Sequence, residues 1–488
     1  MASLSKEDIR SVIETIKELY LEDMIPWICG YSGGKDSTAV VQLVWYALME
    51  LPREQLKKTV HVISTDTLVE SPVVAIWATQ SLKKMEAAAK EHGLPIVPHR
   101  LTPAITNTFW VNLIGRGYPY PRRDFRWCTD RMKIDTSNRF IKSILDAESE
   151  AIMVLGSRKA ESAVRKAVLE GYEKKRYRDH LSPNGSFPNS YVFTPIENWQ
   201  NDNVWQYLMQ VPNPWGHSNK DLLSMYSGAS ADGECPMVID NSTPSCGNSR
   251  FGCWVCTMVT EDKSMAAMIK NDEEKAWMLP MLEFRNDIAA DWQKDRDRRD
   301  FRRKDGRLTW HNSRLVHGPY TKETREYFLR RILQVEKLVH EIGPDEIKDV
   351  PLISMDELQF IRTIWLDEKH EFDDTLPRIY EEVTGRPYHD GVISKNKYFG
   401  APEADLLRTV CAEMYPEEQL LFEMQCALLD TEAKAAAISN KRNVVNNFEK
   451  EIKKAFYKDE KEAENIAATR TTRLTGAIEA SDPDDFVE

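Results

Sequence analysis

Short apolar runs alternate with longer helical patterns over the first third of the chain. Apolar residues recur at helical spacing over residues 8–24, and Pro26 ends that pattern. Four apolar runs follow at 27–31, 60–64, 96–97 and 151–155, with helical patterns between them at 36–50, 73–92 and 131–145. Strands separated by helices indicate crossover connections. We therefore predict an α/β domain whose parallel sheet carries helices on both faces.

The pattern changes in the second half of the chain. A short helix is expected at 202–209, after which Pro, Gly, Ser and Asn accumulate up to residue 250. Beyond residue 258 the periodicity is mainly helical, with long stretches at 322–341 and 403–437. The predicted segments are a helix at 1–25, the α/β domain at 26–230, a cysteine-rich segment at 231–260, a helical domain at 261–460 and a charged, disordered tail at 461–488.

Composition describes a folded chain. The 488 residues are 42% hydrophobic and 29% charged, which excludes collagen-like, disordered and low-complexity classes. The formal net charge of −12 gives no general attraction to nucleic acid, so any such contact would need a local basic patch. The start lacks a signal-peptide pattern and no apolar run is long enough to span a bilayer, so we expect a cytoplasmic protein.

The motif S-G-G-K-D-S lies between the first predicted strand and the helix that follows it. Adjacent glycines allow close backbone approach, the serines and lysine supply donors, and a helix N-terminus presents free N–H groups to an anion. The spacing differs from the mononucleotide loop G-x-x-x-x-G-K-[S/T]. It matches the pyrophosphate loop of enzymes that cleave ATP between the α and β phosphates, and the alternative is a Gly-Gly turn capped by Asp36. The predicted phosphate-binding residues are Ser32, Gly33, Gly34, Lys35, Asp36 and Ser37.

Further candidate residues follow the other predicted strands. Asp66 closes the second strand, where a carboxylate would bind a ribose or base. Arg126 and Cys128 stand in the sequence Arg-Trp-Cys-Thr, behind a basic stretch that we expect to contact an anionic substrate. Gly156 and Arg158 follow the fourth strand, where an arginine would contact phosphate.

Together with Thr-Pro-Ile-Glu-Asn-Trp at 194–199, these motifs resemble the phosphoadenosine phosphosulfate reductase family of the pyrophosphate-loop superfamily. The resemblance covers residues 25–212 and implies the adenine nucleotide alpha hydrolase-like fold. The chain departs from the true reductases because it has neither their C-terminal Glu-Cys-Gly nucleophile nor the Cys-Cys pair of the adenylyl-sulfate enzymes. We therefore do not expect sulfate reduction.

Four of the eight cysteines fall within 22 residues, at Cys235, Cys246, Cys253 and Cys256. Four thiolates with a final Cys-x-x-Cys indicate a metal centre. Zinc sites more often use two Cys-x-x-Cys pairs, so the uneven spacing favours an iron–sulfur cluster while leaving zinc open.

The cysteine spacing and the other motifs together resemble the DndC family, the sulfurtransferases of bacterial DNA phosphorothioation. The resemblance implies a [4Fe-4S] cluster on these four cysteines. It also implies DNA as substrate, a cysteine desulfurase as sulfur donor, and further phosphorothioation proteins that include an SMC-like ATPase.

The expected reaction cleaves ATP to AMP and pyrophosphate, activating a DNA phosphate so that sulfur replaces a non-bridging oxygen. Lys35, Arg158 and Mg²⁺ would neutralise charge on the phosphates. Neighbouring cations would lower the pKa of Cys128 and make it a sulfur carrier; the alternatives are a buried structural thiol, or sulfide held by the cluster. The competing functions are an iron–sulfur tRNA thiolase, a phosphosulfate reductase-like enzyme and a non-enzymatic subunit.

A second basic segment spans residues 294–331, with 13 Lys or Arg against 6 Asp or Glu and with Trp310 and Tyr320 interleaved. Such a segment could follow a nucleic-acid backbone and stack on a base. A helix with interspersed ion pairs gives the same composition.

Overall fold

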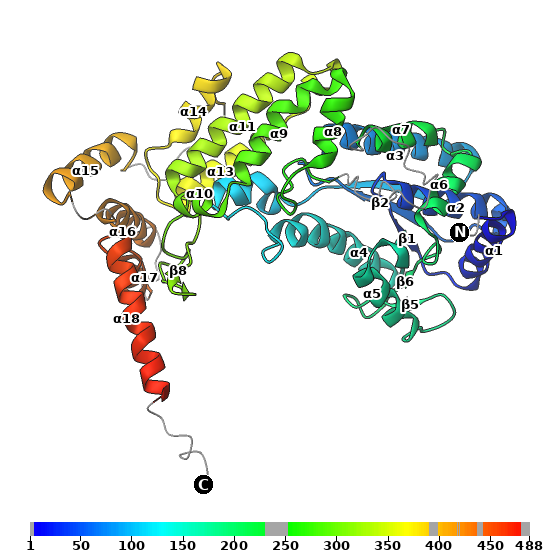
Figure 1. Ribbon diagram of the computed structural model, residues 1–488, viewed down its shortest axis with the longest axis horizontal. Helices are drawn as coiled ribbons and strands as arrows, with labels where there is room; N and C mark the ends of the chain where they lie inside the picture. Colours follow the sequence, from blue (N-terminus) through cyan, green and yellow to red (C-terminus); the bar gives the residue numbers. More distant parts are fainter. Residues whose placement is uncertain are drawn as a thin grey trace, which may run out of the picture. The chain divides into compact units, whose positions relative to one another are not determined.

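The computed structural model describes residues 4–229, 252–389, 399–416, 418, 420–436 and 443–479. These residues form two compact units (Figure 1). The first unit comprises the chain up to Ala104, Pro121–Arg285 and Ile342–Val350. The second unit comprises Ile105–Tyr120, Asn286–Glu341 and the chain from Pro351 onward.

The first unit is built on a mostly parallel six-stranded sheet in the order β3-β2-β1-β4-β6-β5. Only β5 runs antiparallel to its neighbour. The strands are β1 (Trp27–Gly30), β2 (Val60–Thr65), β3 (Ile96–Leu101), β4 (Ala151–Val154), β5 (Ser182–Pro183) and β6 (Ser190–Phe193). The sheet confirms the predicted fold class, although sequence periodicity missed β5 and β6 because both are short and follow a polar stretch.

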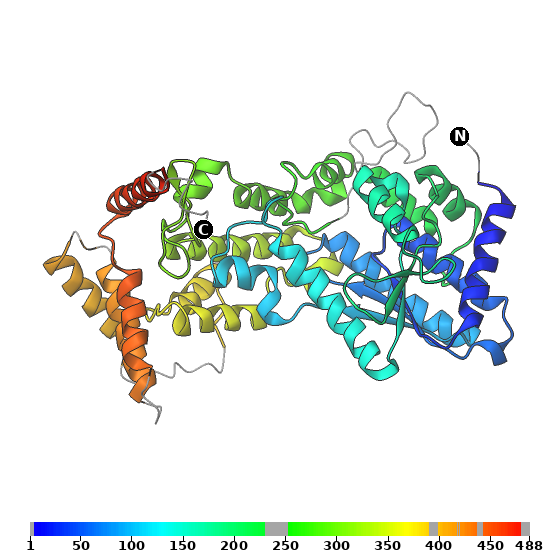
Figure 2. The same ribbon diagram turned by 90° about the horizontal axis from the view of Figure 1, so that it is seen from below.

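Helices of the first unit cover both faces of the sheet, as predicted (Figures 1 and 2). They are α1 (Lys6–Glu22), α2 (Lys35–Met49), α3 (Pro72–His92), α4 (Asp135–Glu148), α5 (Ala163–Glu173), α6 (Asn201–Gln210), α7 (Asn219–Gly228), α8 (Lys263–Asn271) and α12 (Asp345–Lys348). Helix α9 (Leu279–Ile288) crosses from the first unit into the second.

Alternation along the strands divides the core into two layers. Trp27 and Cys29 point into a large cluster with side chains of α1, α2, α3, α6 and α7. Ile28 points the other way, into a smaller cluster that contains Ile141 of α4. Figure 2 looks at the face of the sheet that α4 covers.

The strand order reverses between β1 and β4, because the chain moves outward through β2 and β3 before it returns to β4. Parallel sheets bind ligands at such a switch point, beyond the carboxyl ends of the strands. The S-G-G-K-D-S loop follows β1 and Arg158 follows β4, so the topology brings both to this edge.

The second unit is mainly helical. Its helices are α10 (Trp292–Asp297), α11 (Lys322–Ile342), α13 (Met355–Asp367), α14 (Thr375–Thr384), α15 (Ala401–Met414), α16 (Leu421–Ala436), α17 (Val444–Lys454) and α18 (Glu460–Glu479). A short hairpin joins β7 (Trp310–His311) to β8 (Arg314–Leu315). Buried indoles tie the unit together: Trp110 donates to the Leu352 carbonyl over 2.7 Å and Trp365 to the Ile114 carbonyl over 3.1 Å.

Two predictions for this unit need correction. The single helix predicted at 403–437 is two helices, since α15 ends at Met414, just before Pro416, and α16 begins at Leu421. The tail predicted to be disordered forms α18 over its described part. Ala463 and Ala467 of α18 pack against Leu315, which gives this charged helix a buried face that composition does not reveal.

None of the helices in the described ranges is long and apolar enough to cross a membrane.

The His61–His99 pair makes stability depend on pH. Its ring nitrogens lie 3.0 Å apart beside Phe140, and burial, together with the charge of His99, lowers the pKa of His61 to about 4. Between pH 6.5 and 4 the unfolded chain therefore binds a proton that folded His61 does not, and stability falls as the pH falls. We expect the wild type to lose about 1–2 kcal/mol more than His61→Phe over this range, measured by denaturant unfolding.

The exposed His311 provides the matched control. His311→Gln should keep the pH dependence of the wild type. Parallel stability curves for His61→Phe and the wild type would contradict the assignment.

Candidate functional site

The S-G-G-K-D-S motif forms a tight loop that leads into α2. Gly33 has a φ of +75°, a backbone conformation that glycine adopts without strain, and Gly34 is the N-cap of α2. The Ser37 hydroxyl donates to the Gly34 carbonyl over 3.0 Å and accepts from the Ser32 N–H over 3.2 Å. The loop therefore turns the free N–H groups at the start of α2 toward the carboxyl edge of the sheet. Gly34 is the helix cap, and Asp36 lies in the first helical turn instead.

Three charged side chains meet at this loop. The Lys35 ammonium lies 2.8 Å from one Asp36 oxygen, and Nε of Arg158 lies 2.7 Å from the other. The Arg158 guanidinium is buried and also donates to the Trp199 carbonyl over 3.3 Å. Two cations thus share one carboxylate, which leaves an excess of positive charge next to a helix N-terminus. Such an arrangement suits the phosphates of a nucleotide.

Two aromatic side chains that sequence reasoning missed support the loop. Trp77 of α3 donates its indole N–H to the Gly33 carbonyl over 3.2 Å. The Tyr226 hydroxyl of α7 accepts the Lys35 N–H over 3.4 Å, and its ring lies 5.8 Å from the Lys35 ammonium. Only the tertiary fold brings these helices to the loop, and neither residue stands in a recognisable motif.

Gly156 lets β4 and the loop approach closely. A Cβ at this position would lie 2.9 Å from the Asp36 carbonyl oxygen and 3.2 Å from the Ser37 nitrogen, both backbone atoms. We expect Gly156→Ala to displace the loop, destabilise the protein by about 1–3 kcal/mol and raise the KM for ATP. Thermal unfolding and ATP-cleavage kinetics measure both effects.

Gly171 on α5 is the matched control, because a Cβ there would meet nothing within 4 Å. Gly171→Ala should be neutral or stabilising by up to about 1 kcal/mol. Equal behaviour of the two alanine variants would contradict the role given to Gly156.

Asp66 lies just beyond the end of β2 and already has partners. One carboxylate oxygen accepts the Leu68 N–H over 2.9 Å, and the other lies 3.1 Å from the Arg100 guanidinium. Glu70 is close by, and burial together with the charge of Asp66 raises the pKa of Glu70 to about 7. The structure therefore places Asp66 at the carboxyl edge of the sheet, within a local charge network.

Cys253 and Cys256 form a tight turn next to the same strand end. The Cys256 N–H donates to the Cys253 carbonyl over 2.9 Å, and the Trp254 N–H donates to the Val69 carbonyl over 3.0 Å. The Thr67 hydroxyl lies 3.2 Å from the Cys253 sulfur. The Cys-x-x-Cys turn is thus fixed to the segment that follows β2.

Cys128 lies near this turn. Burial raises the pKa of the Cys128 thiol, and the charge of Cys256 raises it further. The prediction that neighbouring cations lower this pKa is therefore wrong for the described structure, because burial of the thiol has the largest effect on it. The Lys133 ammonium interacts electrostatically with all three cysteines, Cys253, Cys256 and Cys128.

The predicted metal centre is described only in part. Cys235 and Cys246 lie outside the described residues, and the described part holds no group of three or more His, Cys, Asp or Glu side chains arranged to bind a metal ion. The described half fits a metal–sulfur centre, because it presents two thiols on one turn with a hydroxyl near one sulfur and an ammonium near both. Cys253 and Cys256 could therefore supply two of its four ligands.

The basic segment 294–331 is mostly ion-paired within its own unit. Arg299, Arg302 and Arg325 are buried. The guanidinium of Arg302 forms ion pairs with both Asp300 and Glu423. Of the 13 cations, those with an ion pair are Lys294, Arg296, Arg298, Arg299, Arg302, Lys304, Arg307, Lys322, Arg325 and Arg330. This favours the ion-pair alternative over a nucleic-acid contact.

Residues 26–215 match the family model of the phosphoadenosine phosphosulfate reductase domain. The uncharacterized protein MJ0066 of Methanocaldococcus jannaschii is 28% identical over 206 residues, which are 42% of this chain. The match spans only 36% of that relative's length.

Two solved structures resemble parts of the chain more distantly. One is a phosphoadenylyl-sulfate reductase from Candida auris, with 14% identity, a TM-score of 0.25 and coverage of 44% of this chain and 91% of that one. The other is the U34-tRNA thiolase NcsA from Methanococcus maripaludis with its [4Fe-4S] cluster, with 17% identity, a TM-score of 0.28 and coverage of 42% and 62%.

Proposed function

We propose that this protein is an ATP-dependent sulfurtransferase of the DndC type, which replaces a non-bridging oxygen of a DNA phosphate by sulfur. The observation that carries the proposal is that the phosphate-binding loop and the cysteine turn lie at the same edge of the sheet. A phosphate-binding loop with Lys35 follows β1, and Arg158 reaches it from the end of β4. The Cys253–Cys256 turn is attached to the segment after β2, which is adjacent to β1. ATP activation and sulfur chemistry on one edge are what such a transfer requires.

The proposed reaction has two displacement steps. An oxygen of the DNA phosphodiester attacks the α phosphorus of ATP, and pyrophosphate leaves. A sulfur nucleophile then attacks the DNA phosphorus, and AMP leaves with the oxygen that made the first attack. Hydrosulfide gives the phosphorothioate directly, whereas a persulfide leaves a P–S–S bond that a second thiol must cleave, forming a disulfide.

The residues of the loop supply the electrostatics of the first step. The N–H groups at the start of α2, Lys35 and Arg158 would bind the β and γ phosphates and stabilise the leaving pyrophosphate. Mg²⁺ would accompany ATP and neutralise further charge on its phosphates. Asp36 holds the two cations in place.

Among the described residues, the proposed sulfur chemistry uses Cys128, Cys253 and Cys256. A [4Fe-4S] cluster on Cys253, Cys256 and the two cysteines outside the described residues would provide a sulfur-binding or redox-active metal centre. Cys128, whose thiol interacts electrostatically with Cys256 of the turn, is the proposed persulfide carrier. The proposed sulfur donor is a cysteine desulfurase, and an SMC-like ATPase and other phosphorothioation proteins are the proposed partners.

The test uses the anaerobically purified full chain with ATP, duplex DNA, a cysteine desulfurase and cysteine. AMP and pyrophosphate are measured by chromatography, and phosphorothioate dinucleotides by mass spectrometry after DNA digestion. We expect both products, with sulfur only in DNA. Sulfur in tRNA instead of DNA would replace the proposal by the tRNA thiolase alternative, and absence of AMP would overturn both.

Replacing Cys128 by serine separates activation from transfer. We expect Cys128→Ser to lower sulfur incorporation at least about 100-fold, because a hydroxyl cannot carry sulfane sulfur. AMP release in the same reaction should persist as uncoupled hydrolysis. Undiminished sulfur incorporation would remove Cys128 from the chemistry and leave the cluster as the sulfur-binding group.

A further inference from the structure

Two basic segments of the first unit differ from segment 294–331 because they contain several exposed cations without ion pairs among the described residues. Residues 121–142 carry seven Lys or Arg against three Asp, a net charge of +4, and residues 158–178 carry eight against three Glu, a net charge of +5. Together they hold +9 in a chain of net charge −12, so the remaining residues sum to −21. These two segments are therefore, like segment 294–331, local regions of positive charge in an acidic chain.

Many of these cations are exposed and available to a ligand. Arg123, Arg126, Lys142, Lys174 and Lys175 are exposed, and none has an ion pair within the described part of the chain. Arg158, Lys159, Arg176 and Arg178 form shorter, partly buried ion pairs. Two ion pairs along α5 are long and exposed: Arg165 lies 3.4 Å from Glu161 and Lys166 lies 3.8 Å from Glu170, with side chains 51% and 61% exposed. Pairs of this kind contribute little and are easily exchanged for another anion.

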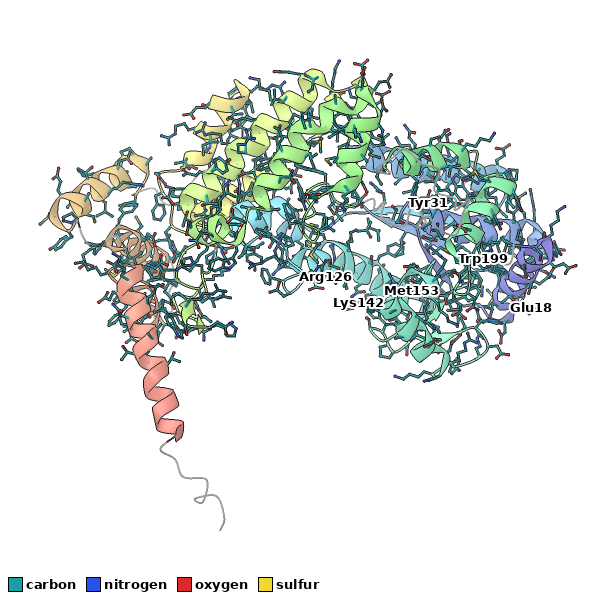
Figure 3. The ribbon with its side chains drawn as sticks, in the orientation of Figure 1. Glu18, Tyr31, Arg126, Lys142, Met153 and Trp199 are labelled. Carbon is teal, nitrogen blue, oxygen red and sulfur yellow. The ribbon has the colours of Figure 1, made fainter. Side chains whose placement is uncertain are left out.

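Helices α4 and α5 lie on the same side of the sheet (Figures 1 and 2). Both begin at its carboxyl edge: the Ser137 hydroxyl of α4 lies 3.2 Å from that of Thr65 at the end of β2, and α5 follows β4 through Arg158. Arg126 precedes the helical stretch that leads into α4, and Lys142 lies on α4 (Figure 3). The basic segments thus begin beside the proposed ATP site and extend away from it along one face.

Apolar and aromatic side chains are interleaved with these charges. From Glu161 to Glu170 only Leu169 is buried, so Val164 and Val168 face solvent, 75% and 44% exposed. Tyr177 is 69% exposed and stacks on Tyr191 with ring centroids 5.0 Å apart. A helix that packs one side chain and exposes cations and valines gives the protein little stability, which points to an interaction surface.

We propose that the surface formed by the 122–126 loop, α4 and α5 binds the phosphate backbone of duplex DNA and guides a phosphate to the loop at 32–37. Exposed, weakly paired cations next to aromatics are the features that bind a polyanion. This inference rests on the proposed function, because it supplies the DNA contact that the proposed reaction requires.

The test reverses three exposed charges that form no ion pair with any described residue. Lys142→Glu, Lys174→Glu and Lys175→Glu are combined, and binding of a fluorescent 20-base-pair duplex to nucleotide-free protein is followed by anisotropy at several salt concentrations. We expect the affinity to fall about 10- to 100-fold at 100 mM salt, and the slope of log K against log salt to fall by about 2 to 3. Thermal unfolding checks that the variant is folded.

The matched control reverses Lys57, Lys83 and Lys220, which are exposed elsewhere on the unit; Lys83 and Lys220 lie on α3 and α7, across the sheet. Both variants change the net charge by −6, so a general electrostatic effect would weaken both equally and overturn the proposal. Unchanged binding by the first variant would overturn it as well. Tighter binding of an RNA hairpin, lost in the same variant, would overturn the assignment to DNA.

The proposed function is judged separately, from AMP formation by the wild type. A wild type that forms no AMP but loses DNA binding only in the first variant would refute the activity and leave the surface supported.

Discussion

Lys35→Met is expected to lower kcat/KM for ATP cleavage to AMP and pyrophosphate about 100- to 1,000-fold. The Lys35 ammonium is one of two cations at the loop, and no other lysine stands on α2 to replace it. Removing a preorganised charge from a developing pyrophosphate costs about 3–4 kcal/mol of transition-state stabilisation. The rate is measured by AMP chromatography under single-turnover and steady-state conditions.

The fold should survive this change, because Asp36 keeps its contact with Arg158. Lys83→Met on the exposed side of α3 is the control and should retain wild-type rates. A Lys35→Met protein that forms AMP at the wild-type rate would show that the loop does not bind the transferred phosphates.

Cys253→Ser is expected to abolish both the metal centre and sulfur incorporation. The Cys253 sulfur lies beside the Thr67 hydroxyl and interacts with the Lys133 charge, and burial raises its pKa to about 11 without a metal. A serine oxygen is a poor ligand for iron, so we expect iron and acid-labile sulfide to fall at least about tenfold and sulfur incorporation at least about 100-fold. Iron, sulfide and visible absorbance are measured after anaerobic purification.

Cys411 of the second unit is the matched control, because it is buried on α15, outside the proposed centre. Cys411→Ala should keep wild-type iron content and colour. A colourless wild type that contains zinc would contradict the cluster, and undiminished iron in Cys253→Ser would remove this cysteine from the ligand set.

Local sequence was sufficient to predict the parallel sheet and its flanking helices. Short apolar runs separated by helical patterns are compatible with few other folds, because each helix can serve as the crossover connection that two parallel strands require. Several of the elements it missed lack a local signal: β5 has two residues, β6 has four, and α18 packs a face of small alanines. The helices α5 and α7 were not predicted either. Pro416 lies within the helix predicted at 403–437, and a proline cannot continue a helix, so α15 ends just before it.

The phosphate loop was readable from sequence because all its functions reside in six consecutive residues. Two glycines, two hydroxyls and a lysine before a helix specify both the backbone path and the donors. The spacing of Cys253 and Cys256 is equally local, and their turn has the geometry that Cys-x-x-Cys predicts.

Tertiary structure decided which distant groups act together. Arg158 meets Asp36 across 122 positions because β1 and β4 are neighbours in the sheet. The Cys253 turn reaches Thr67 across 186 positions because it pairs with the segment after β2.

The fold also determined which charged side chains are buried in ion pairs and which are exposed. Arg302 is buried in ion pairs, whereas Lys174 and Lys175 face solvent, a difference that composition cannot express because burial depends on what packs against each residue. Sequence thus determined the local chemistry of the phosphate loop and the cysteine turn, and the tertiary structure selected the charges that remain available to a substrate.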